Sequence, residues 1–321
     1  MSKYRNRLPQ LSSDLFLTDG GLETTLVFHE GIELPFFAAF TLLGTGEGLA
    51  CLRRYFETYV DIAQRRGVGI VLETATWRAN PDWAAKLGYD AKALAEANRL
   101  GVDLLVDIRK ERESTETPIV ISGNLGPRGD GYRPDARMSV EEAADYHSAQ
   151  IRTFVDSEAD MIAAFTMNYV EEAAGIALAA REAGMPLALS FTVETDGRLP
   201  SGDTLAQAIR TVENISGNWP AYYMINCAHP THFMHVLEEL GPLAARVRGL
   251  RANASRRSHA ELDESTDLDA GDPQELGQQY HELRRWLPAL AVVGGCCGTD
   301  HRHVEAVCHA LQSDRRSSAT A

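Results

Sequence analysis

The chain has 321 residues, of which 44% are hydrophobic and 24% charged, and its formal net charge is −14 at pH 7. This composition is ordinary for a globular protein, and the length suits one large barrel or two smaller domains. The negative charge argues against a nucleic-acid partner or an anionic membrane surface. The sequence has neither a long apolar run nor an apolar leader, so we expect a cytoplasmic protein that does not associate with membranes; its oligomeric state stays open.

Short apolar runs alternate with longer amphipathic stretches, which is the pattern of parallel strands joined by helices. A helix that begins near Leu49 should end at Gly67, a capping box of Ser139 and Glu142 should begin another, and Asp272-Pro273 a third. Strands are predicted at Leu15–Thr18, Gly69–Glu73, Ile119–Gly123, Met161–Thr166, Leu187–Thr192, Tyr222–Asn226, Arg248–Asn253 and Leu290–Gly294. This order predicts an α/β fold, a single-domain (β/α)8 TIM barrel.

The predicted barrel occupies residues 15–312. Residues 1–14 form an N-terminal extension, and residues 313–321 are expected to be a disordered tail. The charged segment 256–272 is predicted to be a long loop after the seventh strand, in a position that suits a lid over the barrel.

Unusual polar and small residues follow directly after predicted strands. In a barrel, the segments after the strands share the C-terminal rim, where barrel enzymes place their active sites. We therefore expect residues far apart in sequence to meet in one pocket. They are Asp19, Gly20 and Gly21 after the first strand, Thr74 after the second, Asn168 after the fourth, Asn226 and Cys227 after the sixth, and Cys296, Cys297 and Thr299 after the eighth.

Three of the five cysteines, Cys227, Cys296 and Cys297, fall on this rim. Three thiolates can hold a zinc ion and leave its fourth position open, which is the arrangement of a catalytic site. The alternative is that they are small buried hydrophobic residues, as free cysteines often are. The spacing leaves both possibilities open. Cys51 and Cys308 lie in helical patterns and are interpreted as structural.

The segments Leu17–Gly21, Asn226-Cys227 and Gly294–Thr299 resemble the homocysteine S-methyltransferase family, which includes S-methylmethionine- and betaine-dependent enzymes. The resemblance runs from about Leu15 to Leu311. It implies a TIM barrel, a Zn²⁺ cofactor held by Cys227, Cys296 and Cys297, and transfer of a methyl group from an onium donor to a thiol, by default homocysteine, giving methionine.

The resemblance also suggests roles for residues around the metal. Asp19, Gly20 and Gly21 match the family's substrate-binding loop, and Thr299 is expected to bind a substrate carboxylate or to cap the last helix. Trp77 is expected to form a wall of the donor pocket by cation–π attraction, or to be plain core. Asn226 is expected to orient Cys227. Several histidines, namely His229, His232, His235, His301, His303 and His309, are interpreted as solvated helix residues rather than ligands.

Two positions depart from the family pattern. After the fourth strand, relatives carry a glutamate that holds the amino group of homocysteine, whereas Asn168 or Phe165 stands there in this chain. Glu23 and Glu73 are the candidate substitutes. Arg78 replaces a tyrosine that betaine-type relatives place near the zinc. The extent of the chain favours S-methylmethionine or S-adenosylmethionine as donor over betaine.

Alternative functions remain for this sequence. They are a methyltransferase with another thiol or an unusual onium donor, a zinc hydrolase on the same barrel, and a binding protein that retains the zinc without turnover.

Overall fold

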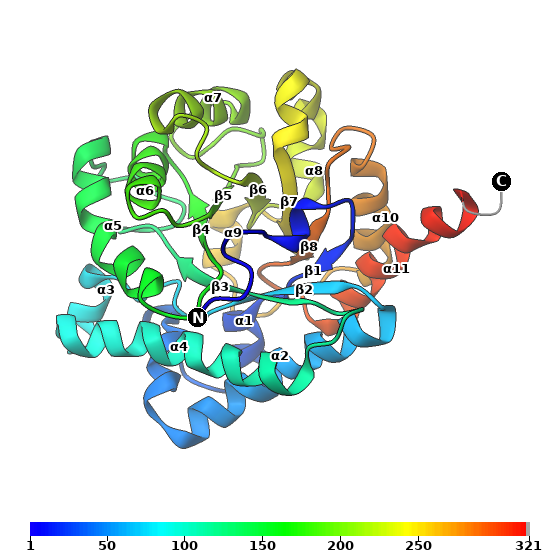
Figure 1. The fold of residues 1–321 in the computed structure, drawn as a ribbon. Coiled ribbons are helices and arrows are strands. Elements are labelled where there is room, and N and C mark those ends of the chain that lie inside the picture. The colour runs from blue at the N-terminus through cyan, green and yellow to red at the C-terminus, as the bar shows by residue number, and fades with distance from the viewer. Residues whose placement is uncertain (319–321) are drawn as a thin grey trace.

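The computed structural model describes residues 1–318, with side chains through residue 312. Eight parallel strands close into a barrel in which each strand pairs with the next and β8 pairs with β1. Helices surround the strands (Figure 1), which confirms the predicted (β/α)8 TIM barrel. The strands are β1 (Phe16–Leu17), β2 (Gly69–Glu73), β3 (Ile119–Leu125), β4 (Met161–Met167), β5 (Leu187–Phe191), β6 (Tyr222–Asn226), β7 (Val247–Ala252) and β8 (Val292–Gly295).

Long helices connect most of these strands, with shorter turns of helix on the rim. None of the described helices combines the length and the apolar character that a membrane span needs. The α-helices are α1 (Leu22–Thr24), α2 (Gly46–Arg66), α3 (Pro81–Lys86), α4 (Ala91–Arg112), α5 (Val140–Val155), α6 (Val170–Glu182), α7 (Leu205–Ser216), α8 (Pro230–Phe233), α9 (His259–Asp263), α10 (Pro273–Leu283) and α11 (His301–Ser318).

The predicted helix signals hold in the structure. Gly67 ends α2 in a left-handed conformation with φ 62°, which glycine adopts without a steric penalty. Both halves of the capping box between Ser139 and Glu142 are present at α5. The Asp272 side chain accepts bonds from the first turn of α10, which begins at Pro273. These signals are local, so they need no knowledge of the fold.

Some boundaries differ from the prediction. The strand β1 has only two residues, and β3 continues through Asn124, which was expected to follow the strand. The segment 256–272 contains the short helix α9, capped by Ser258, and is therefore not loop throughout. The predicted tail overlaps the end of α11 at 313–318, and its last three residues lie outside the described part of the chain.

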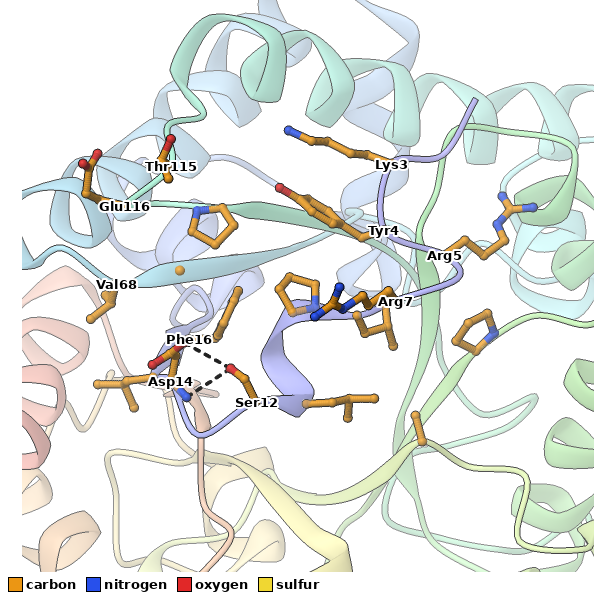
Figure 2. Close-up of a pocket in the computed structure, with 18 of the residues that line it drawn as sticks. Lys3, Tyr4, Arg5, Arg7, Ser12, Asp14, Phe16, Val68, Thr115 and Glu116 are labelled. Atoms are coloured by element: carbon orange, nitrogen blue, oxygen red, sulfur yellow. Dashed lines mark hydrogen bonds between the residues drawn. The ribbon is translucent and has the colours of Figure 1, made fainter.

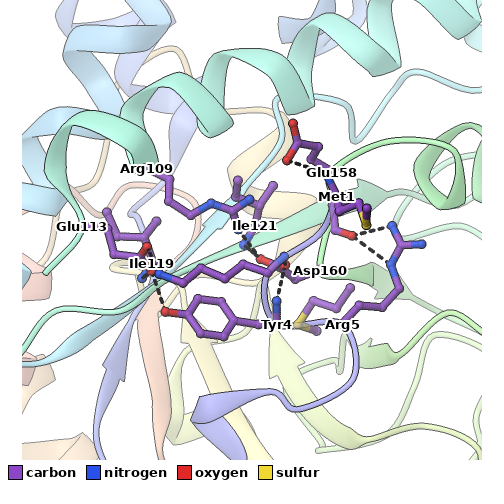
Figure 3. A network of polar contacts seen from close by, with 12 residues as sticks. Met1, Tyr4, Arg5, Arg109, Glu113, Ile119, Ile121, Glu158 and Asp160 are labelled. Atoms are coloured by element: carbon purple, nitrogen blue, oxygen red, sulfur yellow. Dashed lines mark hydrogen bonds and ion pairs between the residues drawn. The ribbon is translucent and has the colours of Figure 1, made fainter. Parts of the chain in front are cut away.

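The N-terminal segment is fastened to the end of the barrel opposite the rim. The buried carboxylate of Asp160, 0% exposed, accepts bonds from the backbone N–H groups of Lys3 (2.8 Å) and Tyr4 (2.7 Å). It also accepts one from Ile121 N–H (2.9 Å) and pairs with the Arg109 guanidinium at 2.6 Å (Figure 3). One carboxylate therefore joins the extension, a helix and a strand.

A hollow of about 1090 Å³ lies at this same end, between the N-terminal segment and the starts of several strands (Figure 2). Lys3, Tyr4, Arg5, Asp14 and Phe16 are among its lining residues. None of the cysteines lines it. This cavity is therefore formed where the N-terminal extension crosses the end of the barrel. The cysteines predicted to be functional lie at the opposite rim.

The substitution Asp160→Asn should lower the free energy of unfolding by about 2–3 kcal/mol, because Arg109 would lose its buried counter-charge while one amide oxygen still accepts hydrogen bonds. The N-terminal segment should become more sensitive to protease. Urea unfolding and limited proteolysis would measure both effects. Asp107→Asn, at an exposed ion pair with Lys110, is the control and should change stability little. Equal unfolding curves for Asp160→Asn and Asp107→Asn would contradict a stabilising role for Asp160.

Candidate metal centre

The three rim cysteines come together although they lie on two different strand ends. Cys227 follows β6, and Cys296 and Cys297 follow β8. The three sulfur atoms lie within 4.8 Å of one another, and the Sγ atoms of Cys227 and Cys296 are 2.6 Å apart. Cys227 is buried, and the other two are partly exposed. Among the described residues, this is the only group of three or more His, Cys, Asp or Glu side chains placed to hold a metal ion.

Glycine brings the segment after β8 close to the segment after β1. A Cβ on Gly21 would lie 2.6 Å from the carbonyl oxygen of Cys296, and one on Gly295 would lie 2.0 Å from Thr299 Oγ1. Both distances are too short for a side chain, so these positions require glycine. The N–H of Gly21 donates to Thr299 O at 3.0 Å. The glycines therefore allow the two segments to support the cysteines.

Cys227 is held in an unusual backbone conformation with φ 54°, and Thr166 at the end of β4 has φ 63°. Positive φ at residues other than glycine is costly and persists where surrounding contacts enforce it. Asn226 supplies such contacts: its amide bonds to Thr166 through both N–H and C=O, each at 2.9 Å, and its oxygen accepts from Ser190 at 2.7 Å. Asn226 thus fixes the backbone beside Cys227 rather than bonding to its sulfur.

The close sulfurs cannot all carry a negative charge unaided. Hydrogen bonds from Cys296 and Cys297 hold the pKa of Cys227 well below its usual range. The bond to Cys227 raises the pKa of Cys296 to about 12, and that of Cys297 is also raised, chiefly by Cys227. A bound cation would stabilise all three thiolates. Three sulfur donors suit a soft metal ion, so the residues fit a metal centre.

Two loops from different sides of the barrel meet over the cysteines. The Tyr132 side chain, from the segment after β3, interacts with the sulfur of Cys227. Its ring lies on that of His259 with centroids 4.0 Å apart. The His259 imidazole also bonds to the Cys227 carbonyl and, at 3.2 Å, to Glu194. The two rings are tilted by 31°, and both residues contact Cys227, so the pair links the cluster to the segment that follows β7.

A buried ion pair lies beside the cluster. Arg251 of β7 pairs with Asp19 at 2.7 Å and donates to the backbone oxygens of Gly20 and Gly295, each at 2.9 Å. Asp19 also accepts a bond from the Tyr55 hydroxyl at 2.9 Å. Burial raises the pKa of Asp19, and the attraction of Arg251 opposes this shift. Asp19 is therefore already engaged within the protein.

Two further carboxylates differ in where they lie. Glu23 is partly exposed and interacts electrostatically with Cys296, and burial raises its pKa to about 7. Glu73 is inside the barrel, 4% exposed, with one oxygen that has no hydrogen-bond partner. Burial raises the pKa of Glu73 to about 8 against the attraction of Arg251. Glu23 is thus the carboxylate of the two that belongs to the cluster.

The substitution Glu73→Gln should make the protein more stable at pH 8 and leave it nearly unchanged at pH 5. The pKa of Glu73 rises on folding from an ordinary 4.5 to about 8, so the folded state binds the proton more tightly and wild-type stability falls as the pH rises through this window. The upper limit is roughly 1.4 kcal/mol for each pH unit. Urea unfolding at several pH values measures it, with the exposed Glu96→Gln as control. A pH-independent difference would contradict the shift.

Other residues predicted for the site make specific contacts. Thr74 is buried and accepts a bond from Asn124 N–H at 2.9 Å. Asn168 is buried, and its amide donates to Asp130 O at 2.8 Å, so it joins two rim segments. The Thr299 hydroxyl donates to Cys296 O at 2.7 Å, so it supports the cysteine segment instead of capping α11.

Trp77 also has a partner within the chain. The guanidinium carbon of Arg78 lies 4.1 Å from the centroid of its ring. The cation over this indole is therefore a side chain of the protein itself.

The histidines lie outside the group of candidate metal ligands, but three of them are not solvated as predicted. His229, His232 and His303 are buried. Each has a hydrogen-bond partner within the protein, which offsets the loss of contact with water. His232 bonds to Arg256 O at 2.8 Å and His303 to Ala270 O at 2.7 Å. Burial lowers the pKa of His229 to about 4, which keeps it neutral.

Sequence reasoning missed Tyr132, His259 and Arg251. Tyr132 follows a glycine-rich stretch after the third strand, and His259 stands in the charged segment after the seventh. An aromatic residue or histidine in a rim segment is the signal that could have pointed to both. Arg251 lies inside a strand where an apolar residue is expected, and a charged residue in a buried strand was the available signal.

Known proteins resemble this chain over the barrel. A family model described as homocysteine S-methyltransferase matches residues 16–311. Selenocysteine Se-methyltransferase of Brassica oleracea var. italica is 24% identical, covering 93% of this chain and 89% of its own. Homocysteine S-methyltransferase of Escherichia coli (strain K12) is 28% identical, covering 73% and 77%. The metallated form of the homocysteine methyltransferase MmuM from Escherichia coli shares the fold with a TM-score of 0.73 at 20% identity, covering 95% and 99%.

Proposed function

The chain belongs to the homocysteine S-methyltransferase family, and from this premise we propose that it transfers a methyl group from a sulfonium or quaternary ammonium donor to a thiol. Homocysteine is the first acceptor to consider, with methionine as product, and S-methylmethionine and S-adenosylmethionine are the first donors. The observation that carries the proposal is the convergence of Cys227, Cys296 and Cys297 on the C-terminal rim.

We propose zinc as the metal. Three thiolates with one open position are the donor set of a catalytic zinc site. Cys227, Cys296 and Cys297 would hold the ion, and the sulfurs of Cys227 and Cys296, which are 2.6 Å apart, would move apart to do so. Bound there, zinc would stabilise the thiolate form of an acceptor thiol at neutral pH. The cysteines must stay reduced for this role, which supports a cytoplasmic location.

The protein's own groups would position and shield the reaction. Tyr132 and His259 lie against Cys227 and would exclude water from that side of the cluster, which strengthens electrostatic interactions inside the site. The acceptor sulfur would attack the donor methyl carbon, the bond from that carbon to the onium atom would break, and the donor would leave neutral. The thiol proton would go to solvent, so no general base is required.

A selenol acceptor is the second candidate, because one relative is named selenocysteine Se-methyltransferase. The same three sulfurs would serve it, since a selenol loses its proton more readily than a thiol. A competition assay with equal homocysteine and selenocysteine would separate the two acceptors.

The proposal is tested by purifying the protein without oxygen, measuring zinc, and assaying each donor with homocysteine. Donors labelled in the methyl group allow the product to be identified by mass spectrometry. We expect about one zinc for each chain and metal-dependent labelled methionine. A zinc-loaded protein that methylates no thiol or selenol from S-methylmethionine, S-adenosylmethionine or betaine would refute the proposed function.

A further inference from the structure

Arg78, in the segment after β2, is a buried cation that forms no ion pair with any carboxylate among the described side chains. It is 9% exposed. Its Nη1 donates to the Gly129 carbonyl at 2.9 Å, and its Nε is buried with no hydrogen-bond partner. A buried charge of this kind is costly unless an anion neutralises it, so the arrangement suits an anionic group of a ligand.

The surroundings of Arg78 determine how an anion can approach. The guanidinium carbon lies 4.1 Å from the ring centroid of Trp77 and 4.0 Å from that of Trp83. Both indoles pack against the guanidinium, Nη1 donates to Gly129 O, and the buried Nε–H on the edge of the group is left without a partner. A carboxylate binds a guanidinium edge through two parallel hydrogen bonds. The guanidinium of Arg78 is therefore suited to bind a carboxylate at its edge rather than to stack on a ring of the ligand.

Glu23, in α1, is the matching unpaired carboxyl group. Its carboxylate has no ion-pair partner among the described side chains and interacts with its own backbone N–H. Its neighbours in the chain lie against the cysteine segment: Gly21 N–H donates to Thr299 O at 3.0 Å, and the Thr24 hydroxyl accepts from Gly298 N–H at 3.2 Å. Glu23 also attracts Arg78, although Asp130 attracts Arg78 more strongly. The neighbouring pair of Asp19 and Arg251 is satisfied internally. Glu23 and Arg78 are thus two charged groups near the cluster without an ion-pair partner among the described side chains.

We propose that Glu23 receives the ammonium group and Arg78 the carboxylate of an amino-acid acceptor whose thiol reaches the cysteine cluster. This inference rests on the proposed function and assigns its acceptor specificity to two residues. Glu23 would supply the counter-charge that Asn168 lacks, since the Asn168 amide is neutral and already donates to Asp130 O at 2.8 Å.

The position of Glu23 assigns the pair to the acceptor rather than to the donor. The acceptor is the ligand whose sulfur must reach the cysteines, and Glu23 lies in the chain between Gly21 and Thr24, which bond to the segment that carries Cys296 and Cys297. An α-amino acid with a side-chain thiol carries the three required groups, a thiol, an ammonium and a carboxylate, on one short chain.

The test removes one charge from the protein and one from the acceptor. Glu23→Gln and Arg78→Met are assayed with homocysteine, with 4-mercaptobutyrate, which lacks the ammonium, and with 3-mercaptopropylamine, which lacks the carboxylate. Glu23→Gln should lower kcat/KM about 10- to 100-fold for the two ammonium-bearing thiols only. Arg78→Met should do so for the two carboxylate-bearing thiols only, and Arg78→Lys should recover part of the loss.

Lys86→Met is the matched control. Lys86 is exposed, and its Nζ lies 3.9 Å from the centroid of Trp83, so the variant removes a cation from the same indole without touching the buried charge. All three acceptors should react as with wild type. Calorimetric titration of the zinc-loaded protein with homocysteine, without donor, gives a second readout: both site variants should bind about 10- to 100-fold more weakly.

Several outcomes would overturn the assignment. Equal losses for all three acceptors would indicate a structural role, and a change in the KM of the donor alone would place the carboxylate on the donor. If the wild type binds homocysteine without methylating it, the proposed function fails. In that case, weaker homocysteine binding by both variants would still support the roles of Glu23 and Arg78. Failure of the proposed function and failure of this assignment are therefore distinguishable.

Discussion

Replacing Cys297 by serine should remove the metal from the protein and abolish methyl transfer. The serine hydroxyl stays protonated at neutral pH and binds a soft cation poorly, so two thiolates would remain where three are needed. Loss of a residue that only supports a metal ligand typically costs 10- to 100-fold, and loss of a ligand itself should cost at least about 100-fold in transfer rate. Elemental analysis and the methionine assay would measure the two effects.

The fold should survive this change, which separates loss of metal from loss of structure. Cys297 is partly exposed, and replacing sulfur by oxygen there removes little buried area. Thermal unfolding of the metal-free variant should match that of metal-free wild type. Cys51→Ser is the control: Cys51 lies in α2, away from the cluster, so zinc and activity should be retained. A Cys297→Ser protein that keeps both would show that the centre does not lie at these residues.

Replacing Arg251 by methionine should lower the free energy of unfolding by about 3–5 kcal/mol, because the buried Asp19 carboxylate would lose its counter-charge. The carbonyls of Gly20 and Gly295 would lose their donor as well. Gly295 directly precedes Cys296, so metal affinity should fall together with stability. Urea unfolding and zinc titration would measure the two effects.

A second substitution tests the cause. Asp19→Asn added to Arg251→Met removes the orphaned charge, so the double variant should be more stable than Arg251→Met alone. Arg53→Met is the control, since Arg53 pairs with Glu57 and Glu111 at the surface and should cost at most about 1 kcal/mol. Additive effects of the Asp19 and Arg251 substitutions would contradict a coupled buried pair.

The barrel and the convergence of the three cysteines could be predicted from the pattern of residues along the chain. Helix ends at Gly67 and Ser139 were predictable because a cap depends on residues within one turn of it. The alternation of strands and helices implied a shared rim, and the rim together with the family resemblance was enough to predict that Cys227 lies beside Cys296. Signals of this kind depend only on the spacing of residues along the chain, so they can be recognised without knowing the tertiary structure.

The side chains that surround the cysteines could be identified only in the folded protein. Tyr132 contacts His259, and Arg251 pairs with Asp19. These contacts join different rim segments, whose paths follow from strand stagger and irregular loop geometry rather than from any periodic pattern. Charge and hydrogen bonding depend on distances of a few ångströms, and sequence spacing does not fix distances between segments that meet only after the barrel closes.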